Sequence, residues 1–394
     1  MRSDGDSADP APDLDREATS DLSATTVISV SGRFGSAPSL AVFLQSLAGL
    51  VSLTALDLAR CCGDAPPLPH ETEALLRALD GALRSLASLK SLSLRGNQIF
   101  GATPHPLTAT SSEALTTLTR SLCESPVTHL DVADTQLIGT SGRQLAGLAY
   151  FCERFVSAKA VSLVLSHNAL HSLALSIIAK TLHTTQRLTH LDLSHNLCAR
   201  DGAGHRSVSG LLDLTKGLLN NHCVRQLDLS YNHLLDDDIV LLCSALEKMP
   251  QLEHLSLAGN HCQGQGMQAI SSMLTHHSLL HPVMGIRRIN LSSNPIGNYV
   301  VELMPGLETS ESLLQLDLAS CQLDDVAAGH LLTAMRRNFT LIALDLEDNA
   351  IDQQVTDAIS AEIIGDALLQ QITCSPCDID ASTLEPQVPC IDTR

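Results

Sequence analysis

The sequence has no tryptophan and, in 394 residues, only six phenylalanines and three tyrosines. Aliphatic residues therefore have to form the core, as they do in a thin core of stacked Leu, Ile and Val. Positive charge is also scarce, because 24 Lys and Arg stand against 43 Asp and Glu, which leaves a formal net charge of −19. Such a charge argues against nucleic acid as the main ligand, since the phosphate backbone is itself negative.

The sequence also lacks the motifs of common nucleotide-binding and hydrolytic enzymes. It contains neither a GxxxxGK[ST] phosphate loop nor a GxSxG nucleophile elbow. We therefore predict that the protein is not an enzyme, and we predict neither catalytic residues nor a cofactor.

Neither a cleavable signal peptide nor a membrane span is expected. Residues 1–21 are acidic and have no apolar core. Residues 34–56 carry no charge, but Pro38, Gln45 and Gly49 interrupt them, so a buried helix followed by a first repeat strand is favoured over a span. Without a secretory signal, the twelve irregularly spaced cysteines are expected to be reduced thiols in a cytoplasmic compartment.

A nine-residue pattern recurs along the chain. Its clearest copy runs from Leu188 to Asn196 (LTHLDLSHN), with leucines at relative positions 1, 4 and 6 and asparagine at position 9. Leu191 and Leu193 alternate with polar residues, which predicts a short strand with one buried face. We expect Asn196 to turn inward and to bond backbone groups that no sheet ladder satisfies.

Eleven such cores follow one another at intervals from 27 residues (Asn294 to Cys321) to 38 residues (Asn97 to Thr135), with a basal unit of about 28. Their closing residues are Cys61, Asn97, Thr135, Asn168, Asn196, Asn232, Asn260, Asn294, Cys321, Asn349 and Cys377. The segments after the cores have helical spacing, and Asp324 and Asp352 are predicted N-caps of two such helices.

The motif LxxLxLxx(N/C) in units of this length resembles the ribonuclease-inhibitor-like class of leucine-rich repeats, over roughly residues 51–377. That resemblance implies a right-handed α/β solenoid, or horseshoe, with a parallel sheet on the concave face and helices on the convex face. Around it we expect a disordered acidic tail (1–22), an N-terminal cap (23–50) and a C-terminal tail (378–394). The class serves inhibitors, innate-immune receptors, GTPase regulators and ciliary scaffolds, so it specifies the fold far better than the function.

Four repeats carry extra residues. Residues 63–70, 100–111 and 199–208 lie between strand and helix, which predicts that they emerge on one rim of the horseshoe. Residues 276–284 are instead expected beyond a helix, on the opposite rim. Insertions often form the binding edge of a repeat protein, and neutral loop growth is an equally open interpretation.

The concave face can be read from the positions that flank the strand leucines. The position between them is Asp in six of eleven cores, which predicts an acidic stripe suited to a basic protein partner. The alternative is that Leu-Asp-Leu-Ser is simply common in this repeat. Because Asp192 is expected to face outward, Asp192→Ala should leave folding nearly unchanged. The candidate partner-binding residues are Asp131, His190, Asp192, His195, Asp228, Tyr231, His254, Arg288, Asp317 and Asp345.

Two patterns that suggest metal or redox chemistry have simpler explanations. His190, Asp192 and His195 share one repeat, but a metal site needs convergent side chains and a curved sheet makes them diverge, so no metal is predicted. Cys374 and Cys377 form a CxxC, yet they occupy a strand-leucine position and an asparagine position of the repeat. That register predicts core cysteines.

These features favour a non-enzymatic interaction scaffold that binds a protein through its concave face or its insertion rim. An axonemal or cytoskeletal subunit would be a form of that scaffold. The alternative is a small-GTPase regulator, because the repeat type is similar to that of Ran GTPase-activating proteins, with Arg60 or Arg95 as a rim arginine. The chain lacks the long acidic C-terminal run of those proteins. A fragment of an innate-immune receptor is a third possibility, although no nucleotide-binding domain is recognised before the repeats.

Overall fold

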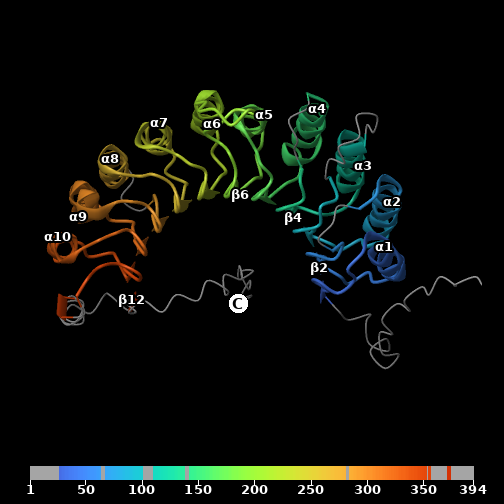
Figure 1. The fold of residues 1–394 in the computed structure, drawn as a ribbon, viewed down its shortest axis with the longest axis horizontal. Helices are drawn as coiled ribbons and strands as arrows, with labels where there is room; N and C mark the ends of the chain where they lie inside the picture. The colour runs from blue at the N-terminus through green and yellow to red at the C-terminus, as the bar shows by residue number, and fades with distance from the viewer. Residues whose placement is uncertain are drawn as a thin grey trace, which may run out of the picture.

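A computed structural model of the protein describes residues 26–63, 67–100, 110–137, 142–280, 284–352, 354–355 and 371–373. Within these ranges, twelve strands form a single parallel sheet whose order follows the chain. Figure 1 shows the sheet along the inside of a curved solenoid and the helices along its outside. The predicted α/β horseshoe is confirmed.

Each strand is three residues long and is aligned with the same repeat position on its neighbours. The strands are β1 (Val27–Ser29), β2 (Ala55–Asp57), β3 (Ser91–Ser93), β4 (His129–Asp131), β5 (Ser162–Val164), β6 (His190–Asp192), β7 (Gln226–Asp228), β8 (His254–Ser256), β9 (Arg288–Asn290), β10 (Gln315–Asp317), β11 (Ala343–Asp345) and β12 (Gln371–Thr373). In β6 and β7, for example, His190 lies opposite Gln226 and Asp192 opposite Asp228. Because the register never slips, each outward-facing position becomes a continuous row across the sheet.

The return legs are mostly helical. The α-helices are α1 (Ala37–Ser46), α2 (Pro69–Ser85), α3 (Thr110–Glu124), α4 (Gly142–Phe151), α5 (Ser172–Leu182), α6 (Ser209–Leu219), α7 (Asp236–Leu246), α8 (Gly264–Leu280), α9 (Met304–Thr309) and α10 (Asp325–Met335), joined by the π-helix η3 (Cys152–Val156) and the 3-10 helix η4 (Gly297–Leu303). The carboxylate of Asp324 accepts the Ala327 N–H at 2.9 Å, which confirms it as an N-cap. Most of the helix predicted after Asp352 lies outside the described residues.

The uncharged stretch at residues 34–56 contains α1 and the first two residues of β2, as the interpretation of a helix followed by a repeat strand requires. None of the helices in the described part of the chain combines the length and the apolar character that a membrane crossing needs.

A ladder of inward-facing asparagines ties each repeat to the one before it. The Asn196 amide donates to Leu193 O at 2.9 Å in its own repeat and to Leu165 O at 3.1 Å in the preceding repeat. Its Oδ1 accepts the N–H groups of Asn168 and Leu170, both at 3.0 Å. The predicted inward asparagine is confirmed, and it bonds backbone groups of two repeats at once.

Cysteine takes over part of this role where it replaces asparagine. The thiol of Cys61 donates to Val30 O at 3.1 Å, and that of Cys321 donates to Leu291 O at 3.2 Å. Both are buried, and burial raises the pKa of Cys321 to about 12, so that it remains a neutral thiol. Cysteine at the asparagine position is therefore a core residue in these two repeats, whereas Cys374 and Cys377, for which the same was predicted, lie outside the described residues.

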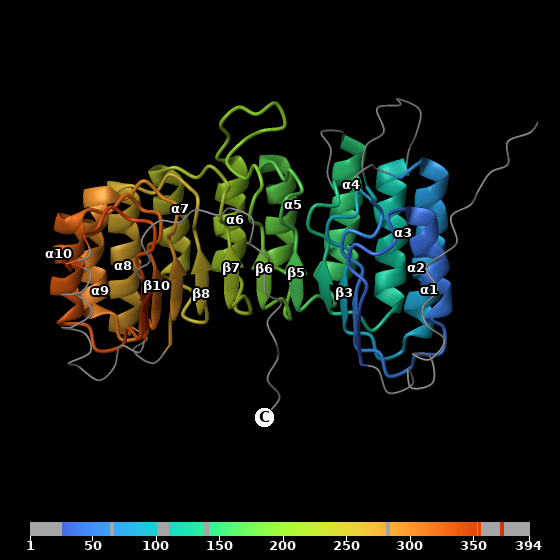
Figure 2. The ribbon, with the colours of Figure 1, turned by 60° about the horizontal axis from the view of Figure 1, so that its bottom comes forward.

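The insertion at residues 199–208 forms a rim hairpin, which rises above α5 and α6 in Figure 2. Asp201 closes its turn by accepting the N–H groups of Ala203 and His205, both at 2.9 Å. Arg206 anchors the hairpin to the next repeat through two hydrogen bonds, 2.8 and 3.0 Å long, to the buried Asp238 carboxylate. Parts of the insertions at 63–70 and 100–111 lie outside the described residues.

The insertion at residues 276–284 differs from its prediction. Residues 276–280 do not lie beyond the helix but extend α8 to Leu280. The physical reason is His277, which is fully buried and continues the inward face of Ile270 and Leu274. Its Nε2 lies 3.0 Å from Leu246 O in the preceding repeat. Residues 281–283 are outside the described ranges.

Candidate functional site

An open groove of about 760 Å³ follows the concave face of the sheet from β5 to β11. Seven of the ten candidate residues line it: His190, Asp192, Asp228, His254, Arg288, Asp317 and Asp345. They occupy two parallel rows, because each strand contributes one residue before its buried leucine or isoleucine and one after it. Asp131, His195 and Tyr231 are not among the lining residues.

The aspartates of the groove have a structural task that the sequence interpretation missed. Each accepts the backbone N–H two residues further on, as Asp192 does from Ser194 and Asp228 from Ser230, both at 2.8 Å. Asn290 makes the same bond, at 2.9 Å, to the Ser292 N–H. The expectation that Asp192→Ala leaves folding nearly unchanged must therefore be revised, because alanine would remove this acceptor.

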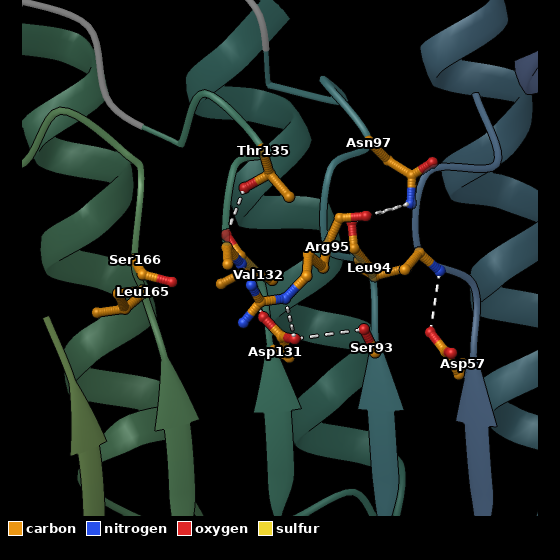
Figure 3. A network of polar contacts seen from close by, with 12 residues as sticks. Asp57, Ser93, Leu94, Arg95, Asn97, Asp131, Val132, Thr135, Leu165 and Ser166 are labelled. Carbon is orange, nitrogen blue, oxygen red and sulfur yellow. Dashed lines mark hydrogen bonds and ion pairs between the residues drawn. The ribbon is translucent and has the colours of Figure 1, made fainter. Parts of the chain in front are cut away.

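Asp131 differs from the groove aspartates in having a cationic partner. Arg95 donates from Nε to Asp131 Oδ2 at 2.9 Å, and Ser93 lies 3.4 Å from the same oxygen (Figure 3). This contact neutralises Asp131 on β4, outside the groove. It also engages the guanidinium of Arg95, one of the two arginines considered for a GTPase regulator. The other, Arg60, folds its side chain over Gly96.

Four groove aspartates, which we call the unpaired aspartates, have no such partner. They are Asp192, Asp228, Asp317 and Asp345. In the described ranges, every ion pair involves some other carboxylate. Neighbouring strands of a sheet are about 5 Å apart, so adjacent members of this set repel each other.

Burial and repulsion perturb two of these groups. Burial raises the pKa of Asp228 to about 6, and the neighbouring Asp192 charge contributes to the increase. Burial likewise raises the pKa of Asp317 to about 6, with smaller contributions from Asp345 and Glu347. Ionising these two carboxylates near neutral pH therefore costs free energy, and a bound cation would reduce that cost.

The parallel row of the groove carries His190, His254 and Arg288. Burial lowers the pKa of His190 and of His254, with His129 acting on the first and Arg288 on the second. Both imidazoles are therefore neutral at pH 7, and Arg288 is the single Lys or Arg among the residues that line the groove. The groove thus has acidic portions on β6–β7 and β10–β11 and one cation on β9 between them.

Beside the groove, three exposed rings form a stack that sequence reasoning did not foresee. The His167 and His195 ring centroids are 4.0 Å apart, and those of His195 and Tyr231 are 4.2 Å apart, with interplanar angles of 14° and 11°. All three residues have φ between 52° and 56°, so their left-handed backbones turn successive side chains the same way. Tyr231 then lies over Gly259, where a Cβ would overlap its ring.

A signal for this stack exists in the sequence. The position just before the repeat asparagine is occupied by His167, His195 and Tyr231 in the stack and by Gly96 and Gly259 in two other repeats. All five residues have positive φ. Glycine at some copies of a repeat position, with His or Asp at others, is typical of a left-handed backbone.

No group of three or more His, Cys, Asp or Glu side chains within the described ranges could hold a metal ion. The site consists of carboxylates, neutral imidazoles, one guanidinium and a ring stack. These groups can recognise a partner through charge and hydrogen bonds.

Comparisons with known proteins agree with this architecture. A leucine-rich-repeat family model matches residues 220–243, which include β7 and most of α7. The human "NACHT, LRR and PYD domains-containing protein 5" is 27% identical to 73% of the chain, and the "Leucine-rich repeat-containing protein 14" of Xenopus laevis is 27% identical to 46% of it. The chain spans only 22% and 35% of these two proteins.

A solved structure with a similar fold is the yeast complex of Rad7 and Elc1. Its matching chain has a TM-score of 0.50 and 15% identity, over 81% of this chain and 69% of that chain. At this identity, the likeness concerns the fold alone.

Proposed function

We propose that this leucine-rich-repeat protein is a non-enzymatic scaffold that binds a basic segment of a protein partner in its concave groove. The observation that carries the proposal is the set of unpaired aspartates within a single groove. A cytoplasmic location and an association with cilia or the cytoskeleton stay predictions.

The energetics of the groove favour a cationic partner. Like charges on adjacent strands repel each other, and this repulsion costs free energy when the carboxylates are ionised. The raised pKa values of Asp228 and Asp317 agree with such a cost. Lysine or arginine side chains of a partner would offset it while pairing with the carboxylates. Because the groove is open to solvent, added salt should weaken the interaction.

The test is affinity capture with the full chain as bait, followed by quantitative mass spectrometry. The groove variant neutralises the unpaired aspartates through Asp192→Asn, Asp228→Asn, Asp317→Asn and Asp345→Asn. A matched control neutralises four exposed carboxylates of the helical side through Glu73→Gln, Glu153→Gln, Asp237→Asn and Glu302→Gln. Both variants change the net charge by the same amount.

Asparagine is chosen because its Oδ1 can still accept the backbone N–H, as Asn290 does from Ser292 in this chain. The groove variant should therefore fold, which its thermal unfolding checks. We expect partners that elute with salt to be lost by the groove variant and kept by the control. Equal capture by wild type and groove variant would refute binding through the groove.

A further inference from the structure

We propose that the partner contributes an arginine side chain, which is recognised by His195, Tyr231, Asp192 and Asp228. This proposal rests on the proposed function. Asp192 and His195 stand at the end of β6, and Asp228 and Tyr231 stand at the same two repeat positions at the end of β7. The strands are hydrogen-bonded neighbours, and the two rings are in contact at 4.2 Å. The four side chains thus form a two-by-two set at one edge of the groove.

The set is rich in hydrogen-bond acceptors. Asp192 and Asp228 each use Oδ1 for a backbone N–H, and Asp228 also accepts hydrogen bonds from the Ser230 and Ser256 side chains. A carboxylate offers about four lone-pair positions in all, so Asp192 can bind several further donors and Asp228 about one. Burial, followed by His167, lowers the pKa of His195, so that its imidazole is neutral at pH 7 and has one acceptor nitrogen. The Tyr231 hydroxyl oxygen adds another acceptor at the next position along the stack.

Arginine fits such a set better than lysine does. The guanidinium has five N–H donors in one plane and is weakly hydrated, so it can bond a carboxylate and a neighbouring acceptor together. An ammonium group is a strongly hydrated point charge, so it gains mainly from the carboxylates. Arg225, which precedes β7, does not satisfy the site from within, because it pairs with Glu253 at 2.5 Å.

The ring stack holds Tyr231 in place before a partner arrives. One face of its ring contacts His195 and the other covers Gly259, while 39% of the residue stays exposed. A side chain confined on both faces loses little rotamer entropy on binding, which is a property of residues that contribute strongly to interfaces. The stack therefore holds the ring of Tyr231 in a fixed position in the turn after β7.

The test uses two fluorescein-labelled nonapeptides that differ only in carrying three arginines or three lysines separated by Gly and Ser. Fluorescence polarisation at pH 7.5 and low salt gives the dissociation constants for the full-length protein. We expect the arginine peptide to bind about tenfold more tightly than the lysine peptide, the value of one additional good hydrogen bond.

Variants assign that preference to the site. Tyr231→Gly keeps a backbone that Gly96 and Gly259 adopt in other repeats, so it should fold. It should reduce the preference to within about twofold and leave lysine-peptide binding nearly unchanged, because the lost acceptor serves the guanidinium. Asp228→Asn should instead weaken the binding of both peptides by the same factor. The four-carboxylate control of the helical side should change neither dissociation constant.

Three results would overturn the arginine site. They are equal binding of the two peptides by wild type, equal weakening of both peptides by Tyr231→Gly, and binding of neither peptide. If the peptides bind equally but Asp228→Asn weakens both, the arginine site is wrong while a basic partner in the groove still stands.

Discussion

Replacing Asp228 with asparagine should stabilise the folded protein at neutral pH. Burial and the adjacent Asp192 charge raise the pKa of Asp228 to about 6 in the folded state, against about 3.9 for an unfolded aspartate. A difference of about two pKa units corresponds to about 3 kcal/mol, and partial solvent access reduces the expected gain to about 1–2 kcal/mol. Asparagine removes the charge and keeps an acceptor for the Ser230 N–H.

The gain should depend on pH in a defined direction. Between about pH 4 and pH 6 the folded state binds more protons at Asp228 than the unfolded state does, so wild-type stability falls as the pH rises through this window. Asparagine does not titrate. The stability difference between Asp228→Asn and wild type should therefore be largest above about pH 7 and nearly absent at about pH 4.

Urea denaturation followed by far-ultraviolet circular dichroism, repeated from about pH 4.5 to pH 8, measures this difference. Asp228→Ala is the matched control, because it also removes the charge but leaves the Ser230 N–H without its acceptor. It should be less stable than Asp228→Asn at every pH. An asparagine variant that is less stable than wild type at pH 7.5, or a difference that does not change with pH, would refute the reasoning.

Asn196→Ala should destabilise the fold by about 2–5 kcal/mol in the same assay, because two buried backbone N–H groups lose their acceptor. Leu191→Ala should cost about 2–5 kcal/mol through the cavity that it leaves, and a loss below about 1 kcal/mol in either variant would contradict its assigned position. Arg206→Ala should cost about 1–3 kcal/mol, because it removes the cation from the buried Asp238 carboxylate. It should also accelerate amide hydrogen exchange in the rim hairpin, and unchanged exchange there would show that Arg206 is not its anchor.

The repeat pattern predicted those features that depend on a single repeat. The alternation of Leu191 and Leu193 with polar residues placed β6, and the spacing to Asn196 placed the inward amide. Both follow from local periodicity, since the buried residues of a short strand and the turn after it are specified within nine residues. The acidic row was predicted for the same reason.

Features that depend on contacts between repeats were harder to predict. The row of aspartates looked like a purely external feature, whereas Asp192 and Asp228 also end their strands by accepting a backbone N–H. The pairing of Asp131 with Arg95 joins two repeats whose separation along the chain gives no signal. The ring stack requires left-handed backbones in successive repeats. The sequence interpretation treated His195 and Tyr231 as extensions of their strands and did not consider a left-handed turn.

The most direct test of groove binding is carboxylate footprinting of the full chain with and without its captured partner. Carbodiimide and glycine ethyl ester label accessible carboxylates, and mass spectrometry reports the labelling of each one. We predict that the partner protects Asp192, Asp228, Asp317 and Asp345 while Glu73 and Glu302 on the helical side stay reactive. Protection of the helical side with unchanged labelling of the groove would contradict the proposed function.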